Sequence, residues 1–131
     1  MSQQGGAAIV GLGFINGLII GTGIGIVAAH LAGVDMIVGM TNGAGAGIIT
    51  GLITAQAYAS GRVGGRSGML VVIGMGAGTV VGIGTGLLVA WSLDLPYIGG
   101  FSAGAAAGLI GGGIIGAILW ASAKTGRFRK E

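Results

Sequence analysis

Residues 13–25 read GFINGLIIGTGIG, with a glycine at every fourth position. The same spacing recurs at 39–51 (GMTNGAGAGIITG), 74–86 (GMGAGTVVGIGTG) and 100–116 (GFSAGAAAGLIGGGIIG). In an α-helix residues i and i+4 lie one above the other, so each stretch predicts a helix with a flat glycine stripe about 18–24 Å long. We call these stripes the glycine ladders and expect them to be the helix-packing surfaces; they comprise Gly13, Gly17, Gly21, Gly25, Gly39, Gly43, Gly47, Gly51, Gly74, Gly78, Gly82, Gly86, Gly100, Gly104, Gly108, Gly112 and Gly116.

Composition places these helices in a membrane. The chain has 131 residues, of which 53% are hydrophobic and 7% are charged, and its mean hydropathy is +0.97. In water each interior glycine would destabilise a helix by roughly 1 kcal/mol relative to alanine. In a bilayer the backbone has no water to bond to, and stripes of small residues promote close helix contact.

Four apolar segments are long enough to cross a bilayer, since a span takes about 20 residues. They cover approximately 7–32, 36–60, 68–93 and 97–123. Tight turns at Asp35 and at Asp94-Leu95-Pro96 close the first and second pairs of segments. The sequence predicts one membrane domain over 1–131, an all-α fold of four transmembrane helices arranged as two helical hairpins.

The basic residues predict the orientation. They fall only in the loop between the hairpins and in the C-terminal tail, whereas both tight turns carry an aspartate. Since cytoplasmic loops are enriched in lysine and arginine, we expect both termini to face the cytoplasm. The six basic residues are Arg62, Arg66, Lys124, Arg127, Arg129 and Lys130.

The second hairpin resembles a copy of the first. Residues 9–56 align on 70–117 without a gap, and the alignment superposes the ladders and the tight turns. Two duplicated hairpins would be related by an axis along the membrane normal. The copies differ in polarity, because Asn42 and Thr50 of the first hairpin correspond to Ala103 and Gly111 of the second.

One helical row beside the second ladder carries oxygen-bearing side chains. Asn42, Thr50 and Thr54 are spaced by four or eight residues, and Asn16 and Gln56 are further polar residues of the same hairpin. Amide and hydroxyl oxygens are hard ligands that suit Na⁺, so these five residues are candidates for an ion path. The alternative, which we favour at this point, is that they hydrogen-bond between helices and only stabilise the bundle.

Several functions are not expected from these residues. The chain has no cysteine, and no nucleophile–base pair or metal-ligand cluster is evident, so we expect no cofactor, no bound metal and no self-contained enzyme. The charge pattern indicates membrane topology, so nucleic-acid binding is not expected. His30 has no second histidine nearby and is expected to lie at the membrane interface.

The chain resembles the C-type integral-membrane subunit of tetrahydromethanopterin S-methyltransferase, over the first half of that longer protein. The similar residues are the stretch 57–61 (AYASG) leading into 68–76 (GMLVVIGMG), His30 before the first tight turn, and the turn at Pro96. The resemblance implies a membrane protein near an ion path in a larger assembly, with methyl transfer carried out by partner chains. It implies no functional residue in this chain.

Two functions are therefore expected. The first is a non-catalytic membrane subunit of an oligomeric complex coupled to an ion, with Na⁺ as the candidate. The alternative is a purely structural protein that assembles into a membrane or virion shell without transport. Both imply contact with the lipid bilayer and with further copies or other membrane subunits, because four glycine ladders exceed what one bundle is expected to use.

Overall fold

The computed structural model describes residues 3–61, 63 and 68–125, and every regular element within them is an α-helix. The helices are α1 (Gln3–Ala32), α2 (Met36–Ala59), α3 (Met69–Ser92) and α4 (Tyr97–Lys124). All four are long and apolar enough to cross a membrane. The predicted fold class is confirmed, and the largest difference in the helix bounds is that α1 begins at Gln3 rather than at residue 7.

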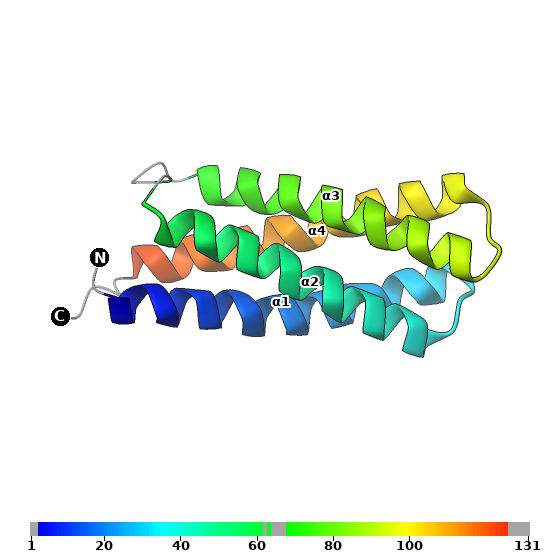
Figure 1. The fold of residues 1–131 in the computed structure, drawn as a ribbon, viewed down its shortest axis with the longest axis horizontal. Helices are drawn as coiled ribbons and strands as arrows, with labels where there is room; N and C mark the ends of the chain where they lie inside the picture. Colours follow the sequence, from blue (N-terminus) through cyan, green and yellow to red (C-terminus); the bar gives the residue numbers. More distant parts are fainter. Residues whose placement is uncertain (1–2, 62, 64–67, 126–131) are drawn as a thin grey trace.

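The helices form an elongated bundle of two hairpins (Figure 1). α1 lies antiparallel to α2, and α3 lies antiparallel to α4. Both tight turns lie at one end of the bundle, which we call the turn end. The start of α1 and the end of α4 lie at the opposite end.

Within each hairpin the two ladders face each other. A methyl group added at Gly43 of α2 would collide with the Gly21 carbonyl oxygen and lie 2.7 Å from the Gly25 Cα of α1. In the second hairpin, a methyl group at Gly82 would collide with the Gly104 carbonyl and lie 2.9 Å from the Gly108 Cα. Only hydrogen fits at these positions, so the two backbones of each hairpin are in direct contact.

This pairing changes the argument for an oligomer. All four ladders are matched within one chain, so they offer no surplus stripes to other chains, contrary to the expectation from the sequence. Other helical glycines have no neighbouring atom within 4 Å of an added methyl group. The clearest cases on the outer faces of α1, α2 and α3 are Gly11, Gly23, Gly45, Gly76 and Gly84.

The two tight turns have the same geometry at equivalent positions of the predicted repeat. Gly33 (φ +67°) and Asp94 (φ +54°) both adopt the left-handed conformation that ends a helix. The next residue then donates a backbone hydrogen bond five residues back, from Val34 N to the Ala29 oxygen (2.9 Å) and from Leu95 N to the Ala90 oxygen (2.8 Å). Each turn therefore places its second helix at once against the first.

The tightest packing between the hairpins lies away from the turn end. The buried residues Ile9, Ala55, Ile115 and Leu119 form a cluster contributed by α1, α2 and α4. Since α1 begins and α4 ends at that side of the bundle, the cluster closes the bundle there (Figure 1).

The orientation in the membrane stays a prediction. Five of the six basic residues that predict it, Arg62, Arg66, Arg127, Arg129 and Lys130, lie outside the described residues. The sixth, Lys124, is the last residue of α4 and lies 5.5 Å from the centre of the Trp120 ring.

Candidate functional site

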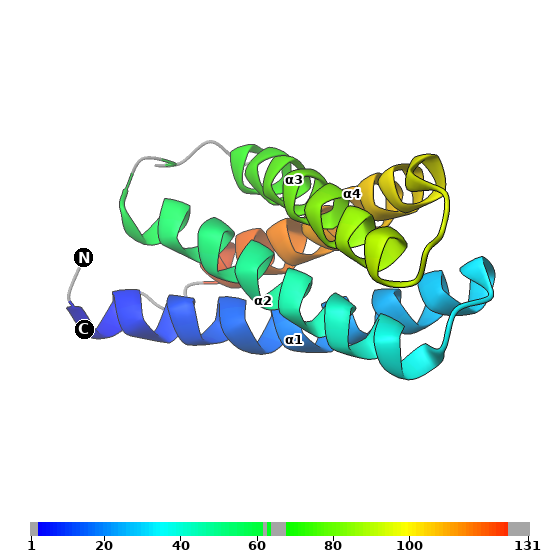
Figure 2. The same cartoon turned by 45° about the vertical axis from the view of Figure 1, so that its right-hand side comes forward.

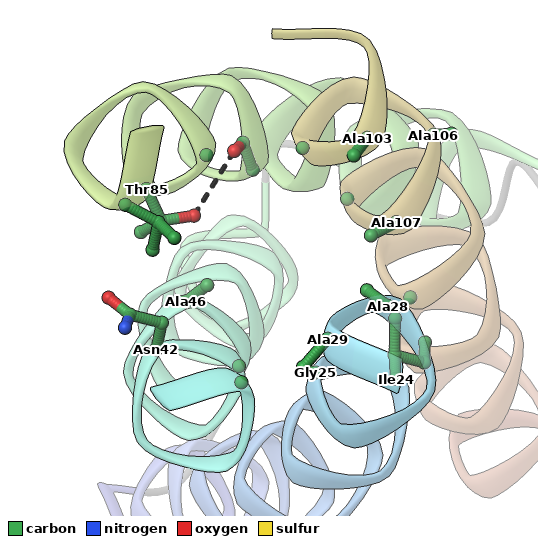
Figure 3. A pocket seen from close by; sticks show the side chains of 18 of the residues that line it. Ile24, Gly25, Ala28, Ala29, Asn42, Ala46, Thr85, Ala103, Ala106 and Ala107 are labelled. Carbon is green, nitrogen blue, oxygen red and sulfur yellow. Dashed lines mark hydrogen bonds between the residues drawn. The ribbon is translucent and has the colours of Figure 1, made fainter. Parts of the chain in front are cut away.

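A cavity of about 660 Å³ lies between the two hairpins in the half of the bundle near the turn end. Figure 2 shows the two tight turns lying well apart, and the cavity occupies the space between the hairpins there. We call it the inter-hairpin chamber. Figure 3 shows part of its lining, including Ile24, Gly25, Ala28, Ala29, Asn42, Ala46, Thr85, Ala103, Ala106 and Ala107.

The chamber extends from the turns to about the middle of the helices. Val34, Leu95 and Pro96 line it at the level of the turns, and Thr50 and Ile115 line its deepest part. Twelve residues of α2 separate Val38 from Thr50, a rise of about 18 Å. Ile115 also belongs to the buried cluster that closes the bundle, so the chamber ends at that cluster and does not cross the bundle.

Polar side chains gather on one wall of the chamber. Asn42 and Thr50 come from α2, and Thr85 comes from α3. In Figure 3 Asn42 and Thr85 lie on the same side of the chamber, across from Ala28 and Ala107 of α1 and α4. The chamber therefore has a polar wall along α2 and α3 and an apolar wall along α1 and α4.

The polar wall retains unused hydrogen-bonding capacity. The Asn42 amide nitrogen donates to the Val38 carbonyl of its own helix (2.9 Å), and the described residues provide no bond to its amide oxygen. Thr50 is 3% exposed, and its hydroxyl has no hydrogen-bond partner among the described residues. Since that part of the chain holds no fully enclosed polar atom without a partner, the Thr50 hydroxyl must be reached from the chamber.

Thr85 contributes mainly as an acceptor. Its hydroxyl donates to the Val81 and Gly82 carbonyls of α3, at 3.0 and 3.1 Å. A hydroxyl that donates in this way keeps oxygen lone pairs that can accept a bond from a molecule in the chamber.

The apolar wall borders the opening of the chamber towards lipid. Val27 and Leu31 of α1 line the chamber while 59% and 81% exposed, and Ile110 of α4 does so while 56% exposed. By contrast Asn42 and Thr85 on the opposite wall are partly buried. A molecule could therefore enter between α1 and α4 and meet the polar wall last.

The five residues predicted as an ion path do not lie together. Asn42 and Thr50 line the chamber, whereas Thr54 is fully buried beyond it and donates its hydroxyl to the Thr50 carbonyl (2.8 Å). Asn16 lies on α1, in the helical row of Leu12 and Ile20, which pack against the buried cluster. Gln56 is exposed and lines a separate hollow beside Leu52 and Ser60.

The hydrogen bonds also bear on the second interpretation of these residues. Those of Asn42 and Thr54 stay within α2, and the threonine hydroxyl bonds of α3 likewise stay within α3. Side-chain bonds between helices, which the alternative expected, are absent from the part of the chain that the structure describes. The described helices are held together by backbone and apolar contact.

Thr85 was not among the residues predicted from the sequence. The two hairpins were compared only at the positions where the first is polar, which left the impression that polarity is kept on that hairpin. The reverse comparison, in which Ile24 corresponds to Thr85, gives the second hairpin a polar residue. That signal is present in the alignment of 9–56 with 70–117.

No protein-family model, curated protein or solved structure matches the chain. The resemblance to the methyltransferase protein, and the functions that it implies, therefore stay predictions. Within the described residues no three histidine, aspartate or glutamate side chains come close enough to hold a metal ion. The inter-hairpin chamber is the candidate functional site.

Proposed function

We propose that this chain is a non-catalytic integral-membrane subunit of a larger membrane complex, to which it contributes a binding chamber. The inter-hairpin chamber supports this function most directly. It combines a buried, unpaired hydroxyl at Thr50 with a free amide oxygen at Asn42, inside a cavity of about 660 Å³. Cavities of about 300–1,000 Å³ with a few polar groups on an apolar lining are typical of ligand sites.

The outer surface supports assembly with other chains. Gly76 and Gly84 lie on the exposed row of α3 that also carries Val80, and an added methyl group at either glycine would meet nothing within 4 Å. Small residues on an outer face let the helix of a neighbour approach closely. These glycines take the role that was expected of surplus ladders.

The test is the native mass of the protein after gentle extraction from its source membrane. The proposal expects this chain to co-purify in fixed proportion with other membrane proteins. A large assembly of this chain alone would contradict it and would favour the structural alternative, a self-assembling shell, which the same exposed glycines support.

Coupling to Na⁺ is the second candidate function. The neutral oxygens of Asn42, Thr50 and Thr85 favour it, since they are hard ligands facing one cavity. The route is incomplete, because Thr54 lies in the closed packing beyond the chamber. An ion crossing the membrane would need the remaining half of its path from a partner chain.

Thermal unfolding in matched NaCl and KCl tests this candidate. Sodium coupling expects Na⁺ alone to raise the melting temperature, and expects Asn42→Ala to abolish the effect. Gln56→Ala is the matched control, because Gln56 is polar, lies on the same helix and is outside the chamber. Equal melting temperatures in the two salts would remove the sodium proposal.

A further inference from the structure

We propose that the inter-hairpin chamber binds a neutral, single-chain lipid whose polar group is a hydroxyl or a carbonyl. This inference rests on the proposed function only in treating the chamber as a binding site. It does not depend on which chains surround it.

The size of the chamber requires an occupant. Protein interiors are packed so closely that few voids exceed the volume of a water molecule, and this one measures about 660 Å³. A helix segment as long as the chamber is deep, about 18 Å, and about 10 Å wide would fill roughly 1,400 Å³. A transmembrane helix of a partner is therefore too large, and a lipid chain is slender enough.

The lining determines the charge of the occupant. No lysine, arginine, histidine, aspartate or glutamate of the described residues lines the chamber. A charged group taken out of water needs an opposite charge or several hydrogen bonds. A fatty acid anion, a phospholipid phosphate or an ammonium group would find neither, so the occupant is neutral.

The two walls determine how the occupant lies. The opening between α1 and α4 is bordered by exposed apolar residues such as Leu31 and Ile110, which suits entry of a chain directly from the bilayer. The polar group of the lipid then reaches the opposite wall. There the Asn42 amide oxygen can accept a bond from a hydroxyl, and the Thr50 hydroxyl can donate to a hydroxyl or carbonyl oxygen.

A photoactivatable probe tests the inference. The intact protein, extracted with its partners and placed in lipid nanodiscs, is exposed to hexadecanol carrying a diazirine beside its hydroxyl carbon. We expect crosslinks to map to α2 between Val38 and Thr54. Hexadecane and hexadecanoic acid with equivalent diazirines are expected to label this segment at least about fivefold less, since they lack the bonds or carry a charge.

Variants separate specific binding from general lipid contact. Thr50→Val and Asn42→Leu keep the shape of the wall and remove its polar atoms, so each should lower labelling by hexadecanol about two- to tenfold and leave labelling by hexadecane unchanged. Ala107→Phe fills the chamber from the apolar wall and should abolish labelling. Ala117→Phe is its control on the same helix, because Ala117 is exposed and outside the chamber.

Four results would overturn the inference. Equal labelling by the alcohol and the hydrocarbon would mean that bilayer chains fill the chamber without selection, and protection by Na⁺ would mean that an ion occupies it. Labelling of the isolated chain but not of the complex would mean that a partner covers the chamber. Failure of unlabelled hexadecanol to compete in the unmodified protein would overturn it even if the variants do not fold.

This outcome is independent of the native-mass experiment. A chain found only as an assembly of its own copies, yet labelled selectively by hexadecanol, would contradict the proposed role in a larger complex and leave the lipid site standing. Co-purified partners with no selective labelling would do the reverse.

Discussion

Ile24 of α1 reaches across the bundle to Gly111 of α4, where a methyl group added to the glycine would lie 3.0 Å from the Ile24 Cδ1. At the equivalent positions of the predicted repeat stand Thr85 and Thr50. One side of the chamber thus carries a large residue opposite glycine, and the other carries two threonines. The exchange makes one wall apolar and the other polar.

Gly111 and its neighbour Gly112 should respond differently to alanine. At Gly111 only the tip of the flexible Ile24 side chain is in the way, whereas at Gly112 a methyl group would meet the Gly74 carbonyl and lie 3.1 Å from the Gly78 Cα. We expect Gly111→Ala to change the free energy of unfolding by less than about 1 kcal/mol, and Gly112→Ala to lower it by roughly 2–3 kcal/mol. Thermal unfolding followed by circular dichroism in one detergent measures both. Equal losses would show that contact between hairpins is as tight as contact within them.

Within α2, Gly45 and Gly47 provide a second matched pair. A methyl group at Gly47 would lie 2.7 Å from the Gly21 Cα, whereas at Gly45 it meets nothing within 4 Å. Gly45→Ala should stabilise the protein by up to about 1 kcal/mol through helix propensity. Gly47→Ala should separate α1 from α2 and speed amide hydrogen exchange there, with α3 and α4 less affected. Uniformly faster exchange in all four helices would contradict the description of each hairpin as a separate packing unit.

The two turns predict opposite effects of similar substitutions. Gly33 has φ +67°, a conformation that is unfavourable by roughly 1–2 kcal/mol for a residue with a Cβ, so Gly33→Ala should lower stability by about that amount. Asp94 has φ +54° at the equivalent turn position, so Asp94→Gly should leave stability unchanged or raise it slightly. Chemical denaturation of both variants measures the difference. A loss at Asp94→Gly would mean that its side chain has a role beyond the turn.

The main features of the fold could be predicted from the sequence because they depend on local rules. Glycine spacing indicated the helix faces, apolar length indicated the spans, and Pro96 with the two aspartates indicated the turns. What the ladders contact could not be predicted, since a glycine stripe fits equally well against its own hairpin, the other hairpin or another chain. The structure selects the first of these.

The candidate site was only partly predictable. Asn42 and Thr50 were identified because polar residues stand out in an apolar span. The chamber itself results from the two hairpins packing closely at Ile9 and Leu119 and lying apart near Val34 and Leu95. That separation is a property of packing between hairpins, and no spacing within one helix encodes it.

Asp35 should stabilise α2 as its N-cap. Its carboxylate accepts a hydrogen bond from the Ile37 backbone N–H at 2.7 Å. Removing the acceptor by Asp35→Ala should lower the free energy of unfolding by about 1 kcal/mol. Asp35→Asn keeps an oxygen acceptor and should retain most of that stability, as measured by thermal unfolding. If both variants lose the same amount, the negative charge and not the cap is what stabilises the turn.

Thr54 tests whether the polar row continues beyond the chamber. Its side chain is fully buried, and its hydroxyl donates to the Thr50 carbonyl at 2.8 Å. Bonds of this kind to a carbonyl four residues back slightly destabilise and bend helices, so Thr54→Val, which keeps the shape, should change stability by less than about 1 kcal/mol. Thr54→Ser removes a buried methyl group and should lower stability by about 1 kcal/mol. Because Thr54 lies outside the chamber, neither variant should alter hexadecanol labelling or any Na⁺-dependent shift in melting temperature. Loss of a Na⁺-dependent shift in Thr54→Val, with stability retained, would show instead that the ion passes the closed end and that the packing there opens.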